Sequence, residues 1–259
     1  MLFWQCQKDK TQPPITAVTK TQIDSTKLGR ILQINTGVCI GNSIIAGHPW
    51  RNSGLELDQL NYPDSFGQIT WHLTQLTHMP WFNAGIGGQT TGQIRNRFLR
   101  DAVGDTLDAY DGRPTVTLAA KPAFVVIEGG VNDIAYNVSL DSIEDNLAWM
   151  ASICKLNKIH CIVLNCVGQG YNQFTQSQTD AIGKLNDWLA SGALDSVQVT
   201  VIDINSIWNS GTYGGVSEYG NDNVHFSTLV NGGDGIHFTQ AGYDSVAHVI
   251  YRVARLPAF

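Results

Sequence analysis

The chain has 259 residues, of which 43% are hydrophobic, and this is enough to bury a large core within one α/β domain. Charged residues make up only 15%, the formal net charge is -6, and lysines and arginines form no run. Such a chain has little attraction for phosphate backbones or anionic lipids, so nucleic acid is not expected as a partner.

The first part of the chain differs from the rest. Residues 1–27 show neither helical nor strand periodicity and are predicted to be a flexible leader, followed by one folded domain over residues 28–259. Met1 to Cys6 are consistent with the end of a bacterial lipoprotein signal at a lipidated Cys6, but Gln5 is unusual before such a cysteine, and a disordered leader is the alternative. No apolar stretch is long enough for a transmembrane segment, and a secreted or cell-surface location is favoured over a cytoplasmic one.

After the leader, short β-branched segments alternate with amphipathic ones. Strands are predicted over residues 37–40, 81–84, 124–128, 161–164 and 197–203. Helices are predicted over residues 65–76, 91–99, 140–156, 176–189 and 240–253. This alternation predicts an α/β fold, a three-layer α/β/α sandwich with a mostly parallel central sheet.

Polar and glycine-rich residues follow three of these strands and precede the last helix. The four segments are Gly41 to Ser43, Asn83 to Gly88, Gly130 to Asp133 and Asp234 to His237. In open α/β sheets, ligands bind beyond the carboxyl ends of the strands, so we expect these segments to meet there.

Together the segments contain the groups that ester hydrolysis needs. Ser43 supplies a hydroxyl nucleophile, His237 a base, Asp234 a carboxylate to orient it, and Gly88 and Asn132 hydrogen-bond donors for an oxyanion. Singly, Ser43 is equally a helix N-cap, Asn132 a turn residue and Asp234 a solvated loop residue. These simpler roles do not explain why all the segments occur together.

In this order, the four segments resemble the catalytic blocks of the SGNH/GDSL-type hydrolases. The resemblance runs from Val38 to about Ile250 and implies a flavodoxin-like SGNH hydrolase fold with serine esterase activity. It implies that Ser43 is the nucleophile and that the Ser43 and Gly88 amides and the Asn132 side chain form the oxyanion hole. It also implies that Asp234 and His237 complete the triad.

The first block departs from the family pattern. In the family this block usually reads Gly-Asp-Ser, whereas in this chain Asn42 precedes Ser43. Asparagine keeps hydrogen bonds of similar reach, but the lost charge could alter the field around His237 or the geometry of the turn. Asp133 has no catalytic role in the family motif and is expected to be structural. Ile45 stands where the Gly-x-Ser-x-Gly elbow needs glycine, so the usual α/β-hydrolase fold is not supported.

Several aromatic residues fall in or near the predicted site loops and could stack on sugar rings. They are Trp50, Trp81, Trp208, Tyr213 and Tyr219. We therefore predict an ester substrate that carries a small acyl group, such as acetyl, on a carbohydrate. His48, five residues after Ser43, either lines the same pocket or is a satisfied polar residue.

Two other functions remain open at this stage. One is a lipase, lysophospholipase or thioesterase of the same family, which a long apolar groove beside Ser43 would favour. The other is a non-catalytic carbohydrate-binding protein that retained the fold, for which Asn42 is the hint. No His-Glu-x-x-His or similar spacing occurs, so neither a metal nor another cofactor is expected.

Overall fold

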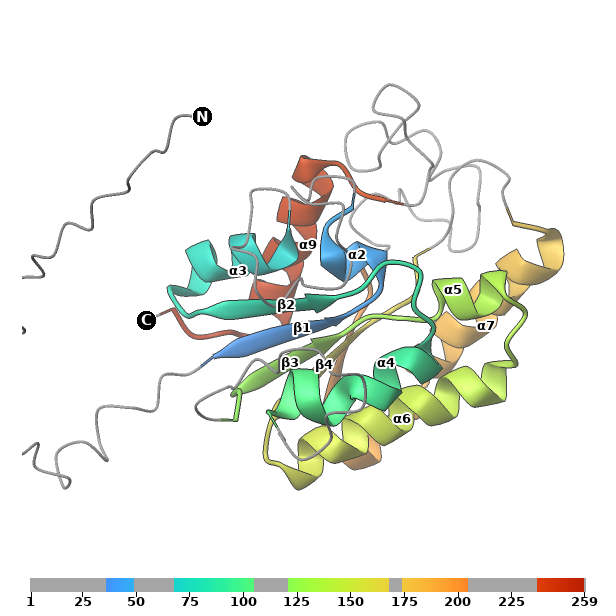
Figure 1. The fold of residues 1–259 in the computed structure, drawn as a ribbon, viewed down its shortest axis with the longest axis horizontal. Coiled ribbons are helices and arrows are strands. Elements are labelled where there is room, and N and C mark those ends of the chain that lie inside the picture. The colour runs from blue at the N-terminus through green and yellow to red at the C-terminus, as the bar shows by residue number, and fades with distance from the viewer. Residues whose placement is uncertain (1–35, 49–67, 105–120, 168–173, 205–236, 259) are drawn as a thin grey trace, which may run out of the picture. The chain divides into compact units, whose positions relative to one another are not determined.

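A parallel sheet organises the fold (Figure 1). The computed structural model describes residues 36–48, 68–104, 121–167, 174–204 and 237–258. Its strands are β1 (Gly37–Gly41), β2 (Trp81–Gly85), β3 (Phe124–Ile127), β4 (His160–Leu164) and β5 (Val199–Ile202). They pair in the order β2-β1-β3-β4-β5, with every pairing parallel. This is the order of flavodoxin-like sheets.

The helices lie on both faces of the sheet. They are α2 (Ser43–Ala46), α3 (Ile69–Thr77), α4 (Thr91–Phe98), α5 (Val131–Ala135), α6 (Leu140–Leu156), α7 (Gln176–Ala190) and α9 (Gln240–Val253), with a π-helix η2 (Leu99–Val103) and a 3₁₀ turn η3 (Asp195–Val197). In Figure 1, α4 and α6 lie on one side of the strands, and α3 and α9 lie on the other. The predicted three-layer α/β/α sandwich is therefore confirmed.

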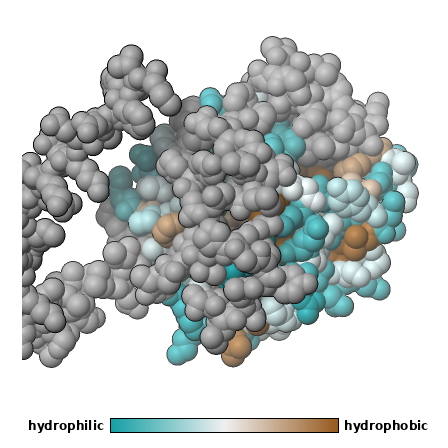
Figure 2. Space-filling view, viewed as in Figure 1, coloured by the Kyte–Doolittle hydropathy of each residue, from teal (hydrophilic) through white to brown (hydrophobic). Residues whose placement is uncertain are grey.

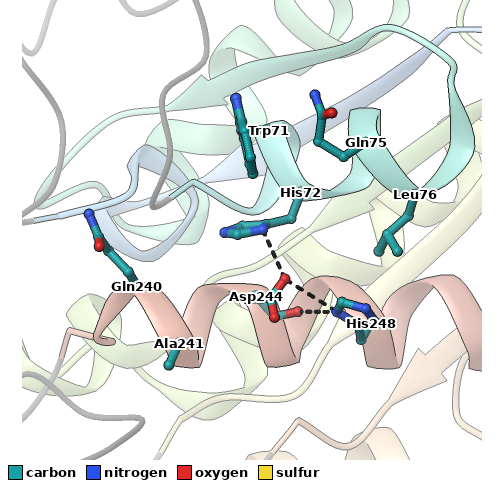
Figure 3. Close-up of a pocket in the computed structure, with 8 residues that line it drawn as sticks. All are labelled: Trp71, His72, Gln75, Leu76, Gln240, Ala241, Asp244 and His248. Atoms are coloured by element: carbon teal, nitrogen blue, oxygen red, sulfur yellow. Dashed lines mark hydrogen bonds and ion pairs between the residues drawn. The ribbon is translucent and has the colours of Figure 1, made fainter.

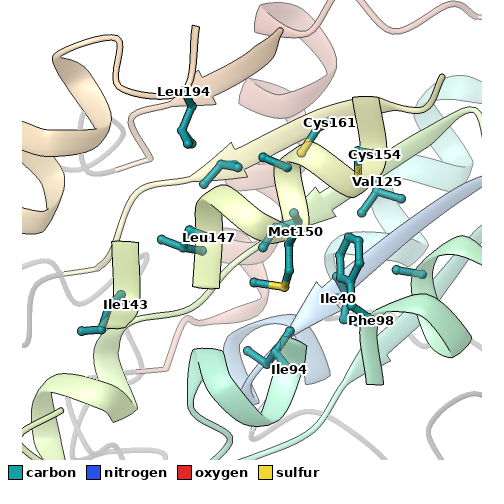
Figure 4. Close-up of a cluster of buried hydrophobic side chains, with 14 of the residues drawn as sticks. Ile40, Ile94, Phe98, Val125, Ile143, Leu147, Met150, Cys154, Cys161 and Leu194 are labelled. Atoms are coloured by element: carbon teal, nitrogen blue, oxygen red, sulfur yellow. The ribbon is translucent and has the colours of Figure 1, made fainter. Parts of the chain in front are cut away.

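The two layers of helices follow from the alternation of side chains along each strand. On β1, Val38 and Ile40 join one hydrophobic cluster while Cys39 joins another. The first cluster, the α6-side core, also contains residues of α4 and α6, which Figure 4 shows, and residues of α7. The second, the α9-side core, contains residues of α2, α3 and α9. Strands buried on both faces read as continuous apolar runs, which is why the sequence predicts them well.

Local capping explains where several helices begin. Thr90 and Thr175 each form a capping box with the glutamine three residues later, at the starts of α4 and α7. Ser139 caps α6 and Thr239 caps α9. Helices α6 and α9 have the bounds that the sequence predicts.

Other bounds differ from the prediction. The last predicted strand begins two residues later, at Val199, because Val197 belongs to η3 and Gln198 is its C-cap, and the second predicted helix continues as η2. The short helices α2 and α5 were not predicted, because four or five residues show no helical period.

The described residues all belong to one compact unit, Ile34–Phe259. The predicted leader and Cys6 lie outside the described residues, so the boundary at residue 28 stays a prediction. Hydrophobic side chains on the described surface form scattered patches between hydrophilic ones in the view of Figure 2. None of the described helices combines the length and apolar character needed to cross a bilayer.

Candidate functional site

The middle strand of the site is β1, which is flanked by β2 and β3. Gly41 pairs with Gly85 of β2, and Ile40 pairs with Ile127 of β3. All three strands run in the same direction, so the segments that follow them emerge at one edge of the sheet. The sheet thus brings together the turns that carry Ser43, Gly88 and Asn132.

The turn after β1 places Ser43 at the first position of α2. The Oδ1 atom of Asn42 accepts a hydrogen bond from the Ile44 amide at 2.8 Å and so caps this helix. Ser43 keeps 9% of its surface exposed, although its helix is otherwise buried. Glycine at position 85 permits the close approach of β2, because a Cβ there would lie 2.1 Å from the Ala46 nitrogen.

The turn after β2 is bonded to both of its neighbours. The Ile86 amide donates to the Gly41 oxygen at 3.0 Å, which joins this turn to the one that precedes Ser43. Gly88 has φ +76°, a conformation that suits glycine. Asn132, on α5, donates from Nδ2 to the Gln89 oxygen at 2.9 Å. That bond uses one of the two Nδ2 hydrogens and leaves the other for a ligand.

Asp133 has a structural role in this arrangement. Its buried carboxylate accepts hydrogen bonds from the Thr91 nitrogen at 2.8 Å and from Thr91 Oγ1 at 2.6 Å. Burial raises the pKa of Asp133, while the bonds from Thr91 oppose that change. These contacts tie α5 to the first turn of α4 and so help to hold Asn132 beside Gln89.

His237 reaches the same region from the segment that precedes α9. Its ring lies beside that of His48, with centroids 5.3 Å apart and an interplanar angle of 38°. His48 in turn donates its backbone amide to the Ser43 oxygen at 3.1 Å, and its own oxygen accepts from Tyr243 Oη at 2.7 Å. Thus, although they are far apart in the sequence, the end of α2 and the start of α9 are joined through His48.

One predicted substrate residue has a different position. Trp81 is only 2% exposed and packs in the α9-side core, where its Nε1 donates to Thr77 Oγ1 at 3.1 Å. It begins β2, whereas the site lies where β2 ends, so the prediction that it binds substrate is wrong. Asp234, Trp50, Trp208, Tyr213 and Tyr219 lie outside the described residues.

Arg97 contributes to the site but was not predicted from the sequence. It is only 6% exposed, on α4, and donates from Nε to Gln89 Oε1 at 2.7 Å and from Nη2 to the Gly41 oxygen at 3.0 Å. Its Nη1 pairs with Asp101 at 3.0 Å. The guanidinium therefore connects the turn before Ser43 to the turn that holds Gly88.

Glu128 is a second such residue. It follows β3 directly, is fully buried, and accepts a hydrogen bond on Oε1 from Asn42 Nδ2 at 3.2 Å. Burial raises the pKa of Glu128 to about 7, and the interactions with the side chain and the backbone amide of Asn42 oppose this only in part. A glutamate at the end of an otherwise apolar strand is the signal that could have drawn attention to it.

A separate pocket lies between α3 and α9 (Figure 3). It has a volume of about 710 Å³ and contains none of the predicted site residues. Within it, Asp244 Oδ1 contacts His72 Nδ1 at 2.9 Å and His248 Nδ1 at 3.3 Å. Across the described ranges, no three or more His, Cys, Asp and Glu side chains are grouped so that they could hold a metal ion.

Comparison with known proteins gives a family match. The model of the GDSL-like Lipase/Acylhydrolase family matches residues 39–244, which include Ser43, Gly88, Asn132 and His237. None of the curated proteins compared with the chain matches it.

Solved structures share the fold at low sequence identity. A GDSL-like lipase from Bacteroides thetaiotaomicron is 22% identical, with a TM-score of 0.58, and the match covers 89% of this chain and 95% of that one. A G-D-S-L family protein from Desulfitobacterium hafniense is 19% identical, with a TM-score of 0.58 and coverage of 85% and 99%. Axe2, an acetylxylan esterase from Geobacillus stearothermophilus, is 18% identical, with a TM-score of 0.55 and coverage of 84% and 93%.

Proposed function

The chain belongs to the GDSL-like lipase/acylhydrolase family, and from that membership we propose that it is a serine esterase which removes small acyl groups, most simply acetyl, from carbohydrate. The observation that carries this proposal is the hydrogen-bonded group of turns after β2, β1 and β3. It gathers Ser43, Gly88 and Asn132 at one edge of the sheet, with His237 reaching the end of α2 through His48.

In the acylation step, Ser43 Oγ attacks the ester carbonyl while His237 accepts the hydroxyl proton. The carbonyl oxygen becomes an oxyanion, which the amides of Ser43 and Gly88 and the second Nδ2 hydrogen of Asn132 stabilise. The C–O bond to the alcohol then breaks, and the alcohol leaves with the proton from His237. Asp234 is proposed to hold the imidazole in the required tautomer and to stabilise its protonated form.

In the second step, water replaces the alcohol. His237 takes a proton from the water as its oxygen attacks the acyl-serine carbonyl, and the same donors hold the second oxyanion. When the bond to Ser43 Oγ breaks, the serine recovers its proton from His237 and the carboxylic acid is released. The net reaction consumes one ester and one water and forms one alcohol and one acid.

The carbohydrate part of the proposal rests on aromatic residues near this edge. Among the described residues, Tyr136 is 66% exposed and lies four positions after Asn132, where it ends α5. Trp50, Trp208 and Tyr213 are proposed to add further aromatic surface. The shared fold of Axe2, an acetylxylan esterase at 18% identity, is consistent with this part of the proposal.

Fluorophosphonate labelling tests the proposal directly. The intact protein is expected to gain one adduct on Ser43, located by peptide mass spectrometry, and Ser43→Ala is expected to gain none. A panel of acetylated sugars, long-chain acyl esters and acyl thioesters then tests the substrate. Absence of a Ser43 adduct would favour the non-catalytic carbohydrate-binding function, whereas preference for long acyl chains or thioesters would favour the lipase or thioesterase alternatives.

A further inference from the structure

Glu128 is a buried carboxyl group that the proposed mechanism does not use. It is 0% exposed, and its backbone amide donates to the Ile40 oxygen at 3.1 Å, which fixes it beside β1. One carboxyl oxygen, Oε1, accepts the bond from Asn42. Within the part of the chain that the structure describes, the other, Oε2, is buried with no hydrogen-bond partner. Burial of a carboxyl is costly, so its presence behind the nucleophile requires an explanation.

Asn42 connects this carboxyl to the nucleophile helix. Its side chain is fully buried and has two distinct ends: Nδ2 donates to Glu128, and Oδ1 accepts from the Ile44 amide. Helix α2 has only four residues and cannot be stable by itself, so its orientation depends on such contacts. A rotation of the Asn42 amide would break the cap and shift the residue between Asn42 and Ile44, which is Ser43.

We propose that Glu128 is a positioning residue for Ser43, and that it acts by fixing the orientation of the Asn42 side chain. This inference rests on the proposed function, because it treats Ser43 as the nucleophile. The acceptor on Glu128 determines which end of the Asn42 amide faces Ile44. Glu128 and Asn42 thus form one unit, in which each residue requires the other.

The proposal accounts for asparagine where the family pattern has aspartate. An aspartate at position 42 could still accept from the Ile44 amide, but its second oxygen would face Glu128 Oε1. Two buried carboxyls at hydrogen-bond distance favour a shared proton, because two negative charges held there together repel each other strongly. Asn42 carries its own donor hydrogens and so makes the contact in either ionisation state of Glu128.

Other groups around Glu128 bear on its ionisation. Asp133, on α5, disfavours the charged form of Glu128. Burial raises the pKa of the Cys166 thiol beyond β4, and Glu128 raises it further. Arg97, on α4, is bonded to the Gly41 oxygen, next to Asn42. A second carboxylate at position 42 would therefore enter a region that already holds two carboxyls.

The experiment exchanges donor and acceptor between the two positions. The rate constant of Ser43 labelling by a fluorophosphonate, and kcat and KM for an aryl acetate, are measured at about pH 6 and about pH 8.5. The variants are Glu128→Leu, Glu128→Gln, Asn42→Asp and Asn42→Asp combined with Glu128→Gln. Glu144→Gln, which changes a carboxyl on the outer helix α6, is the matched control.

Loss of the acceptor in Glu128→Leu is expected to lower kcat and the labelling rate by about tenfold or more, with KM little changed, because small shifts of a nucleophile are costly. Glu128→Gln keeps an acceptor oxygen, so its kcat and labelling rate should fall less than those of Glu128→Leu. The kcat and labelling rate of Asn42→Asp, relative to those of the intact protein, should be lower at about pH 8.5 than at about pH 6. At the higher pH the pair of carboxyls loses its shared proton. In the double variant the glutamine amide can donate to the carboxylate at position 42, so most of the rate should return.

The decisive comparison is between Asn42→Asp and the double variant. If the double variant is no faster than Asn42→Asp, or if Glu128→Leu folds and labels at the rate of the intact protein, the proposal is overturned. Should Glu128→Leu fail to fold, the comparison between the other two variants still decides. If the intact protein is not labelled at Ser43, the proposed function has failed instead. In that case the proposal is tested by hydrogen exchange of the Ile44 amide. Slow exchange in the intact protein and the double variant, with fast exchange in Asn42→Asp, would support the pairing of Glu128 with Asn42. Equal exchange rates in all three proteins would overturn it.

Discussion

The side chain of Asn132 donates a hydrogen bond to the backbone oxygen of Gln89 at 2.9 Å, and so joins the turn after β3 to the turn after β2. We expect Asn132→Ala to lower kcat for an aryl acetate by about 10²–10³-fold with a small change in KM, because an oxyanion donor acts chiefly in the transition state. Asn157→Ala, at the end of α6, removes an asparagine of similar bonding and serves as the control. A rise in KM with kcat unchanged would assign Asn132 to substrate binding instead.

Arg97 offers a test of how far the turns depend on one side chain. Arg97→Lys retains the charge but cannot donate to Gln89, Asp101 and Gly41 at once. We expect it to lower the free energy of unfolding by about 2–4 kcal/mol and kcat by about tenfold, measured by urea unfolding and steady-state kinetics. Arg95→Lys, on the same helix, is the matched control, because Arg95 bonds to Asn146 and stacks on Trp149. Similar losses in both variants would argue against a special role for Arg97.

The pKa of Glu128 predicts how stability changes with pH. The folded-state pKa is raised from 4.5 to about 7, so the folded protein holds a proton that the unfolded chain has released. The stability associated with this proton is fully present below about pH 4.5 and is lost as the pH rises through about 7, by an amount on the order of 3 kcal/mol. Urea unfolding at several pH values should show this decline in the intact protein and a smaller one in Glu128→Gln. Parallel curves for the two proteins would contradict the prediction.

The pKa of His72 predicts a dependence of stability on pH that is opposite in sign to that of Glu128. Burial lowers its pKa, and His248 lowers it further, while Asp244 has the opposite effect (Figure 3). The unfolded chain therefore takes up this proton first, and stability is lost as the pH falls below about 6.5. Replacement of His72 by glutamine should reduce the difference in Tm between about pH 7.5 and about pH 5.5. His78→Asn, at the exposed C-cap of the same helix, should leave that difference unchanged.

Tyr136 tests the carbohydrate part of the proposed function. If its exposed ring stacks on a sugar, Tyr136→Ala should raise KM for acetylated oligosaccharides by roughly fivefold to thirtyfold, the effect of about 1–2 kcal/mol of stacking. Hydrolysis of a small aryl acetate should change little, because that substrate does not reach the ring. Tyr136→Phe should behave like the intact protein. Equal changes for both substrates would place Tyr136 outside sugar recognition.

The sequence predicts elements best where burial is complete. The strands around Ile40, Val126 and Ile162 are apolar on both faces, so their positions follow from the sequence, as do those of α6 and α9. The order of the strands does not follow from it, because pairing depends on contacts between distant segments. The same reason explains why the contacts of Asn42 with Glu128 and of Arg97 with Gly41 could not be predicted, since each joins residues that are far apart in the sequence.

Trp81 illustrates a second limit of sequence reasoning. Its position near the second motif suggested a role in binding, but the strand between them is long enough to place the tryptophan at the opposite end of the sheet. Trp81 is buried there by Thr77 and by the α9-side core, whose residues are not part of the second motif. Proximity in sequence to a motif is therefore a weak guide when a whole strand intervenes.

The strand order places β1 between β2 and β3, separated from β5 by β3 and β4. The turns after β2 and β1 are bonded to each other and to Arg97 of α4, whereas α5 is also supported by α7, since Gln178 Nε2 donates to the Ile134 and Ala135 oxygens. A change confined to β5 reaches β1 through β4 and β3, so it is expected to leave the surroundings of Ser43 intact. Stabilising substitutions are therefore best sought at that edge, with Gly85 left unchanged, because a Cβ there would lie 2.1 Å from the Ala46 nitrogen.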